Sequence, residues 1–272
     1  MAPQQRATRE FDAHSPATHL ILIASFVFAL FLVVQAPGAE EILRDTFDSA
    51  GLPIAYLVAG KGEPVVLIHG LCSSADINWQ LPGTVKLLAE RYRVIALDVR
   101  GHGRSGKPKE EDAYGAKMAE DVLRLLDHLK IEKAHIVGYS MGGMIAMKLI
   151  TEHPERVLSG TLGGMGWFRE GSFLQGFWGM VAGREGSSDS KPLLRGMGKL
   201  AVTEGAVKKV QVPVAVLVGD RDPCKQLYVL PLARIRPDWA VIEIEGADHF
   251  TCILKAQFKE ELKKWLDKNA RK

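Results

Sequence analysis

The stretch that decides the fold is Ala134–Glu152, with the sequence AHIVGYSMGGMIAMKLITE. Its first part, Ala134–Val137, predicts a short buried strand. Its last part, Met141–Glu152, predicts a helix. The turn between them must be tight, because glycines lie close on both sides of Ser140. The stretch therefore predicts a buried strand, a sharp turn at Ser140 and a helix.

The turn itself is the pentapeptide Gly138-Tyr139-Ser140-Met141-Gly142, which has the pattern G-x-S-x-G. Between a strand and a helix, this pattern holds the serine in a strained conformation that exposes its hydroxyl group. The N-terminus of the following helix directs backbone N–H groups towards a developing oxyanion. A tight turn with a purely structural serine is the alternative, but the strand–turn–helix context favours a nucleophile.

Strands and helices alternate along the chain from Glu40 onward, which predicts an α/β fold with a mostly parallel sheet. The helices are expected at Leu81–Tyr92, Met118–Leu129, Met141–Glu152 and Ile253–Leu266. The strands are expected at Ile54–Ala59, Pro64–Ile68, Val94–Leu97, Ala134–Val137, Val157–Leu162, Val214–Val218 and Val241–Ile244.

Two further motifs accompany the pentapeptide: His69-Gly70-Leu71, which follows a predicted strand, and the segment Asp98–Ser105, DVRGHGRS. Together the three motifs resemble those of the α/β-hydrolase superfamily, from about Asp45 to the C-terminus. The similarity is to the branch that contains serine esterases, cofactor-free haloperoxidases and carbon–carbon bond hydrolases. The resemblance implies an α/β-hydrolase fold, in which a mostly parallel central sheet is flanked by helices and carries a short helical cap.

The resemblance also implies a catalytic triad in the chain order serine, acid, histidine. A serine needs a base to accept its proton, and the base needs a carboxylate to orient it. Ser140 is the expected nucleophile. His249, in a loop after the last strand, is the expected base, whereas His153 lies at the end of the helix that follows Ser140 and is expected at the surface.

Three carboxylates compete for the role of the acid. Asp222 occupies the position at which similar hydrolases carry it, after the strand Val214–Val218. Asp220 is closer to the end of that strand and is expected to accept hydrogen bonds from loop N–H groups. Asp248 is adjacent to His249 and is expected to be structural.

The oxyanion hole requires two preorganised backbone donors. The N–H of Met141 follows the nucleophile, and the N–H of Leu71 lies in the loop that His69 opens; both are the expected donors. His69 is expected to brace this loop. A polar network near the site is expected from Asp98, Arg100, His102 and Ser105.

The expected function is that of a serine hydrolase that cleaves carboxylic esters through an acyl-enzyme. A nucleophilic serine argues against epoxide hydrolase and haloalkane dehalogenase activity, for which similar proteins carry aspartate. The sequence has no P-loop, dinucleotide fingerprint, CxxC pair or HExxH motif, so no cofactor and no metal are expected. Cleavage of carbon–carbon bonds, thioesters or amides, acyl transfer and non-catalytic ligand binding are alternatives that the fold leaves open.

The interval from about residue 163 to 210 interrupts the alternation and falls where similar proteins carry a cap. Its aromatic residues predict an apolar wall over the serine and favour small or medium apolar ester substrates. Trp167 and Phe168 are candidate substrate contacts. The alternative is packing of these rings into the core. The aromatic residues of the interval are Trp167, Phe168, Phe173, Phe177 and Trp178.

The segment Leu20–Val34, LILIASFVFALFLVV, is uncharged and apolar. It is short for a membrane-spanning helix and has the length of a signal-peptide core. We expect residues 1–39 to be a signal peptide or an N-terminal membrane anchor, with membrane association through residues 20–36. Residues 40–272 then form the hydrolase domain outside the cytoplasm. A buried core helix is the alternative.

Composition limits the remaining possibilities. The 272 residues are 47% hydrophobic and 25% charged, which is typical of a globular protein and excludes intrinsic disorder. A net charge of +3 gives no indication of nucleic-acid binding. Three cysteines cannot build a disulfide scaffold. Three free thiols are expected, and a Cys224–Cys252 disulfide is the alternative.

Overall fold

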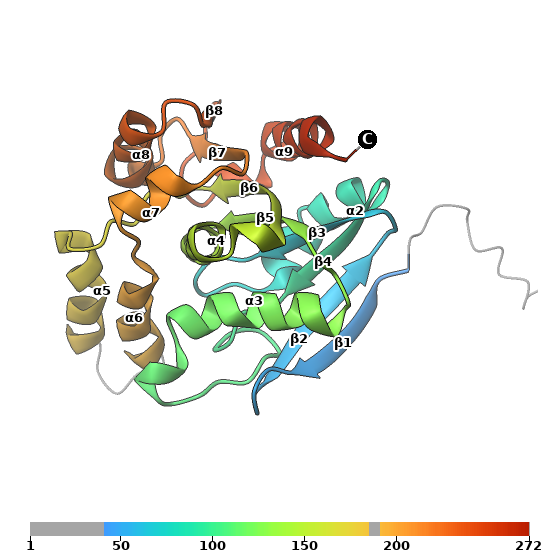
Figure 1. Ribbon diagram of the computed structural model, residues 1–272, viewed down its shortest axis with the longest axis horizontal. Coiled ribbons are helices and arrows are strands. Elements are labelled where there is room, and N and C mark those ends of the chain that lie inside the picture. The colour runs from blue at the N-terminus through green and yellow to red at the C-terminus, as the bar shows by residue number, and fades with distance from the viewer. Residues whose placement is uncertain (1–40, 185–190, 272) are drawn as a thin grey trace, which may run out of the picture. The chain divides into compact units, whose positions relative to one another are not determined.

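The structure is a computed structural model that describes residues 41–184 and 191–271 (Figure 1). The leader or anchor predicted for residues 1–39 lies outside these ranges. Within them, no helix combines the length and the apolar composition that crossing a membrane requires.

The described chain is built on a sheet of eight strands in the order β1-β2-β4-β3-β5-β6-β7-β8. β1 and β2 pair antiparallel, as do β2 and β4, and the remaining neighbours pair parallel. The predicted α/β fold with a mostly parallel sheet is thereby confirmed. The bounds are β1 (Leu43–Asp48), β2 (Pro53–Ala59), β3 (Glu63–Ile68), β4 (Tyr92–Leu97), β5 (Ala134–Tyr139), β6 (Val157–Gly163), β7 (Val214–Gly219) and β8 (Ala240–Ile244).

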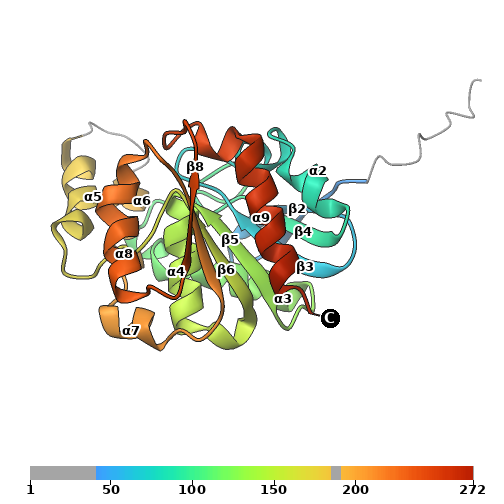
Figure 2. The same cartoon turned by 90° about the horizontal axis from the view of Figure 1, so that it is seen from above.

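Helices cover both faces of the sheet (Figures 1 and 2). One face packs against α3 (Ala116–His128) and α4 (Met141–Glu152), and the other packs against α2 (Thr84–Ala89) and α9 (Ala256–Asn269). Strands β5 and β7 are buried along their whole length, which explains the continuous apolar sequence of β7. In β5, the buried His135 is hydrogen-bonded to Ser159 and Glu63. This arrangement brings the C-terminal ends of the parallel strands, and the loops after them, to one edge of the sheet.

The structure differs from the predicted elements in several places. The helix expected at Leu81–Tyr92 is the shorter α2, Thr84–Ala89, and Tyr92 is the first residue of β4. The helix Leu230–Ile235 was not predicted. β1 was not predicted, because Phe47 is its one buried residue and the strand therefore lacks an apolar alternation. The last helix begins at Ala256 rather than Ile253, since Cys252–Leu254 form a separate 3₁₀ turn. The amphipathic pattern continues through that turn and conceals the boundary.

Between β6 and β7 the chain forms α5 (Phe173–Arg184), α6 (Lys191–Met197) and α7 (Glu204–Lys209). α5 and α6 lie side by side at the edge of the domain (Figures 1 and 2). The side chain of Trp178 lies outside the described part of the chain, so its predicted contribution to an apolar wall stays a prediction. α8 (Leu230–Ile235) follows β7 and packs on the same face as α4.

Candidate active site

Ser140 lies at the sharp turn between β5 and α4, with φ 53° and ψ −114°. This conformation is strained for a residue with a side chain, and it persists because the surrounding backbone leaves no alternative. A Cβ at Gly138 would lie 2.0 Å from the carbonyl oxygen of Gly142, and a Cβ at Gly142 would lie 2.1 Å from that of Ile68. Both glycines are therefore required by close backbone approach.

His249 links Ser140 to Asp222. Its Nε2 lies 2.9 Å from Ser140 Oγ, and its Nδ1 lies 2.8 Å from Asp222 Oδ2. An ionised carboxylate only accepts hydrogen bonds, so Nδ1 carries the ring proton and Nε2 is free to accept the serine proton. Asp222 is buried, and its second oxygen accepts the Cys224 N–H at 2.8 Å. The structure thus brings the three predicted residues into one hydrogen-bonded chain.

The other candidates for the acid and the base, Asp220, Asp248 and His153, form hydrogen bonds outside the triad. Asp220 accepts the Ala247 N–H at 3.0 Å, and hydrogen bonds from the Gly246 and Ala247 N–H groups hold the pKa of its carboxyl below the usual value. Asp248 accepts the N–H groups of Phe250 and Thr251. His153 lies 3.3 Å from Glu155 at the surface. None of these three predicted alternatives contacts Ser140.

Both predicted oxyanion donors lie beside the nucleophile. Met141 is the first residue of α4, so its N–H has no partner within the helix. Leu71 lines the same cavity as Ser140, and its N–H has no acceptor among the described residues. The neighbouring Gly70 N–H does have one, the Oδ1 of Asn78 at 2.8 Å. The hydrogen bond between Gly70 and Asn78 therefore fixes the loop, and the neighbouring Leu71 N–H stays available as an oxyanion donor.

His69 braces this loop from beneath. Its Nε2 accepts the Val99 N–H at 2.9 Å, and its Nδ1 donates to the Gly70 carbonyl at 2.7 Å. Burial, together with the neighbouring His102, lowers the pKa of His69 to about 4. His69 is therefore neutral at neutral pH, which the acceptor role of Nε2 requires.

The predicted polar network lies beneath the loop and away from the serine. Asp98 accepts the N–H groups of Ala75 and Arg104, each at 2.8 Å, and Arg100 forms a buried ion pair with Asp121 at 2.6 Å. Ser105 Oγ donates to the Asp98 carbonyl, and His102 lies 3.3 Å from the Arg100 carbonyl.

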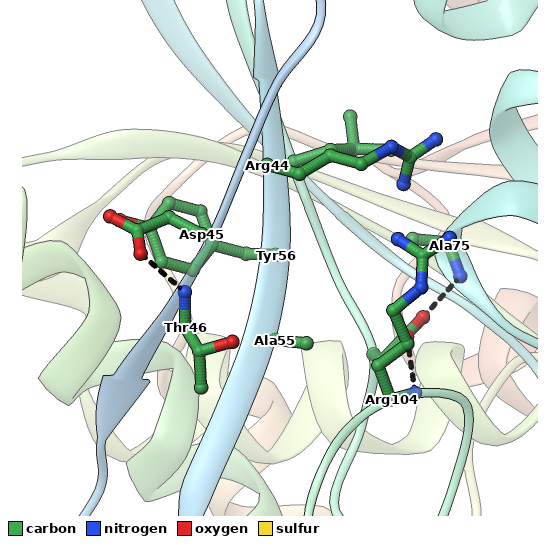
Figure 3. Close-up of a pocket in the computed structure, with 9 residues that line it drawn as sticks. Arg44, Asp45, Thr46, Ala55, Tyr56, Ala75 and Arg104 are labelled. Carbon is green, nitrogen blue, oxygen red and sulfur yellow. Dashed lines mark hydrogen bonds between the residues drawn. The ribbon is translucent and has the colours of Figure 1, made fainter.

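A cavity of about 150 Å³ opens beside this network, between β1, β2 and the loop that contains Arg104 (Figure 3). Arg44 and Arg104 both line it. Both guanidinium groups pair with the same carboxylate, that of Asp76, at 2.6 and 3.2 Å. One carboxylate balances only part of their charge, and none of the described residues that line this cavity is serine, cysteine or histidine.

The cavity that contains Ser140 and His249 has a volume of about 380 Å³. Trp167 and Phe168 do not line it. They are 5% and 1% exposed and pack in the core, and the Trp167 indole donates to the Val202 carbonyl at 2.9 Å. Their assignment as substrate contacts is therefore replaced by core packing. The residues that line the cavity are Gly70, Leu71, Cys72, Ser73, Asn78, Tyr139, Ser140, Met144, Met197, His249, Phe250 and Ile253.

Tyr139 and Asn78 were not predicted from the sequence as site residues. The Tyr139 hydroxyl donates to the backbone carbonyl of His249 at 2.6 Å. Tyr139 occupies a variable position of G-x-S-x-G, and Asn78 lies in a short helical turn outside every motif. Neither position carries a sequence signal that marks it.

One group of described residues has the spacing of a metal site: Asp222, Cys224 and His249, whose ligand atoms lie within 4.8 Å of one another. Asp222 and His249 already bond to each other. Burial, followed by the charge of Asp222, raises the pKa of the Cys224 thiol to about 12, so the thiolate that binds metals is disfavoured. The triad accounts for these residues better than a metal does.

Comparison with known proteins identifies the fold. A family model described as the alpha/beta hydrolase fold matches residues 63–182. Among solved structures, the enol-lactonase from Burkholderia xenovorans LB400 is similar with a TM-score of 0.71 and 23% identity, covering 82% of this chain and 100% of that chain. The resemblance inferred from the sequence is confirmed at the level of the fold: the chain has the α/β-hydrolase fold.

Two curated relatives are similar over less than half of the chain. The dihydrolipoyllysine-residue acetyltransferase component of an acetoin cleaving system from Pseudomonas putida is 44% identical over 119 residues, which cover 43% of this chain and 31% of that protein. The 2-hydroxy-6-oxo-6-(2'-aminophenyl)hexa-2,4-dienoic acid hydrolase from Metapseudomonas resinovorans is 36% identical over 114 residues, 40% of this chain and 38% of that protein. The chain thus spans less than half the length of these relatives. The fold and the name of the second relative support a hydrolase.

Proposed function

We propose that the protein is a serine hydrolase that cleaves carboxylic esters through an acyl-enzyme. The observation that carries the proposal is the position of His249, within hydrogen-bonding distance of both Ser140 Oγ and Asp222 Oδ2. This is the arrangement that nucleophilic catalysis by serine requires. It lies next to two preorganised backbone donors and inside a cavity large enough for a small ester.

In the proposed mechanism, Ser140 Oγ attacks the acyl carbon while His249 Nε2 takes its proton. The N–H groups of Leu71 and Met141 stabilise the negative oxygen of the tetrahedral intermediate. The carbon–oxygen bond to the alcohol then breaks, and the alcohol leaves with the proton from His249. Water attacks the acyl-enzyme with His249 as base, and release of the acid restores Ser140.

The lining of the cavity favours apolar acyl or alcohol groups of small or medium size. Leu71, Met144, Met197 and Ile253 contribute apolar walls, and Phe250 contributes its ring. Apolar walls with a few placed polar groups are typical of sites for small molecules. A volume of about 380 Å³ limits the part of the substrate that is enclosed.

A fluorophosphonate probe tests the nucleophile directly. We expect the folded protein to be labelled, and we expect Ser140→Ala to abolish both labelling and hydrolysis of p-nitrophenyl esters. Ser172→Ala, in which a serine outside the cavity is removed, is the matched control and should be labelled like the wild type. Labelling that survives Ser140→Ala would refute the assignment.

A panel of p-nitrophenyl esters from acetate to decanoate tests the bond class. Turnover with an optimum at short or medium acyl chains supports an esterase. A labelled protein that hydrolyses no ester would instead favour one of the other reactions: carbon–carbon cleavage, thioester or amide hydrolysis, or acyl transfer. A folded protein that is neither labelled nor active would favour a non-catalytic ligand-binding role.

We further propose that the hydrolase domain acts outside the cytoplasm, because the segment Leu20–Val34 is apolar and uncharged. Fusion of residues 1–39 to alkaline phosphatase, which is active only after export, tests this. Activity of the fusion in intact bacterial cells supports export. Extraction of the full-length protein with alkaline carbonate then distinguishes a cleaved leader from a membrane anchor.

A further inference from the structure

Asn78 has one half of its amide group occupied and the other half free. Its Oδ1 accepts the Gly70 N–H at 2.8 Å. Because a backbone N–H can only donate, the amide atom that faces it must be the oxygen, and this fixes the orientation of the side chain. Its Nδ2 has no acceptor among the described residues, yet Asn78 lines the cavity that contains Ser140. A donor of fixed direction is therefore available inside the site.

The position of this donor is close to the reacting serine. A Cβ at Gly70 would lie 3.3 Å from Ser140 Cβ and 3.6 Å from Asn78 Oδ1. The side chains of Ser140 and Asn78 both lie next to Gly70. Asn78 and Ser140 therefore line neighbouring parts of the same cavity.

Ser73 adds a second unused polar group. It lines the same cavity, and its Oγ is buried without a hydrogen-bond partner. Buried polar atoms are nearly always paired, so this hydroxyl can gain a partner when the side chain rotates towards the cavity that Ser73 lines. Ser73 and Asn78 both lie between β3 and α2, so one ligand can contact both side chains.

The charge of the cavity restricts what the ligand oxygen can be. None of the described residues that line the cavity is lysine or arginine. A carboxylate would lose its water without gaining a counter-ion, which is unfavourable in an apolar site. A neutral carbonyl, ether or hydroxyl oxygen gains a hydrogen bond without that cost.

We propose that Asn78, assisted by Ser73, forms a polar subsite that binds a neutral hydrogen-bond acceptor of the substrate beside the scissile ester. The inference rests on the proposed esterase function and specifies its substrate class. The protein selects esters that carry a second, uncharged oxygen over plain alkyl esters and over esters with a second carboxylate.

The test compares three p-nitrophenyl esters of equal acyl chain length: an alkanoate, its analogue with one methylene replaced by an ether oxygen, and one with a terminal carboxylate. Each kcat/KM is divided by the rate of alkaline hydrolysis to remove intrinsic reactivity. We expect wild type to prefer the ether ester about threefold to tenfold over the alkanoate, the range for one neutral hydrogen bond. The carboxylate ester should be the poorest substrate.

Asn78→Asp keeps an oxygen for the Gly70 N–H and removes the donor. This variant should abolish the preference for the ether ester, and Ser73→Ala, which removes only a hydroxyl without a partner, should reduce it. Asn269→Asp, the same substitution at the C-terminal end of α9, is the control and should leave it unchanged. A preference that survives in both Asn78→Asp and Ser73→Ala would overturn the inference.

Binding measurements separate this inference from the proposed function. Calorimetry with Ser140→Ala compares a methyl alkanoate with its ether analogue where no hydrolysis can occur. Tighter binding of the ether analogue that is lost on adding Asn78→Asp supports the subsite even if wild type proves inactive on esters. Equal binding of the two ligands overturns the subsite, whether or not wild type is an esterase.

Discussion

The Tyr139 hydroxyl donates to the backbone carbonyl of His249 at 2.6 Å, across 110 positions of sequence. The tyrosine next to the nucleophile thus holds the loop that carries the base. Its ring also lies beside the imidazole, with centroids 5.8 Å apart. Burial is the largest of the effects that raise the pKa of Tyr139 far above its usual value, so the hydroxyl stays a donor throughout the working pH range.

We therefore expect Tyr139→Phe to lower kcat of ester hydrolysis by about tenfold, since loss of one hydrogen bond loosens the position of the base. KM should change little, because the ring that lines the cavity remains. A merely structural role would lower the melting temperature without this split between kcat and KM. Both quantities are measured on the same preparation, and an unchanged kcat would contradict a positioning role.

Asp222→Asn is expected to lower kcat by about 10⁴-fold while leaving the fold intact. An amide can present its NH₂ group to His249 Nδ1, which favours the tautomer that cannot accept the serine proton. Asp220→Asn is the matched control, because Asp220 bonds to a backbone N–H rather than to the histidine. A comparable loss of kcat in both variants would argue against Asp222 as the orienting acid.

Removing one partner of the buried ion pair between Arg100 and Asp121 is expected to destabilise the fold strongly. Both side chains are almost fully buried, and two guanidinium nitrogens bond to the two carboxylate oxygens, each at 2.6 Å. Asp121→Asn leaves a buried charge without its counter-ion and should cost about 3–5 kcal/mol of unfolding free energy. Glu120→Gln, which breaks the exposed pair with Arg124, should cost at most about 0.5 kcal/mol.

Denaturant unfolding monitored by circular dichroism measures both variants. A loss below about 1 kcal/mol for Asp121→Asn would show that water or a neighbouring group replaces the partner. The comparison also tests whether the DVRGHGRS segment is structural, as its position beneath the oxyanion loop indicates.

The sequence predicts this site well where backbone geometry requires particular residues. A Cβ at Gly138 or Gly142 would clash with a backbone carbonyl oxygen, so both positions require glycine. The G-x-S-x-G pattern therefore identifies the turn. The order of serine, acid and histidine follows from the order of the strands. These features depend on local chain geometry and on topology, which a sequence pattern can encode.

Side chains whose roles depend on tertiary contacts were not predictable in the same way. Trp167 and Phe168 were assigned to substrate because the cap is aromatic, yet they pack in the core. Asn78 was missed because its role arises from a contact with Gly70 that no spacing indicates. β1 was missed because an edge strand with one buried side chain has no apolar period.

The three cysteines are expected to be free thiols of very different reactivity. Cys72 is exposed, whereas Cys252 is buried and Cys224 is partly buried. Burial, as the largest effect, raises the pKa of both Cys224 and Cys252 to about 12. Because the thiolate is the reactive form, a thiol reagent at pH 8 should modify one cysteine rapidly and the other two only after unfolding.

Cys72→Gly is the variant that assigns the rapid reaction. Cys72 has φ 56°, a conformation that glycine adopts without strain, so the variant should fold and lose the fast phase. Three thiols should be counted in denaturant without reductant. A count of one would instead show a Cys224–Cys252 disulfide.

The stability of the domain is expected to fall as the pH is lowered from 7 to 5. Burial, as the largest effect, lowers the pKa values of His69, His102 and His135, that of His69 to about 4. The native state therefore holds these imidazoles neutral in a range where the unfolded chain, with a pKa near 6.5, binds protons. Stability is complete above about pH 6.5 and is lost as the pH falls towards 4.

From His69 alone, the loss of unfolding free energy between pH 7 and pH 5 is about 2 kcal/mol, and the other two histidines add to it. Urea unfolding at pH 7, 6 and 5 measures this loss. Carboxylates contribute mainly at lower pH, because their unfolded pKa values are near 4. An unfolding free energy that stays constant over this interval would mean that His69 accepts a proton in the native state, which would break its bond from the Val99 N–H.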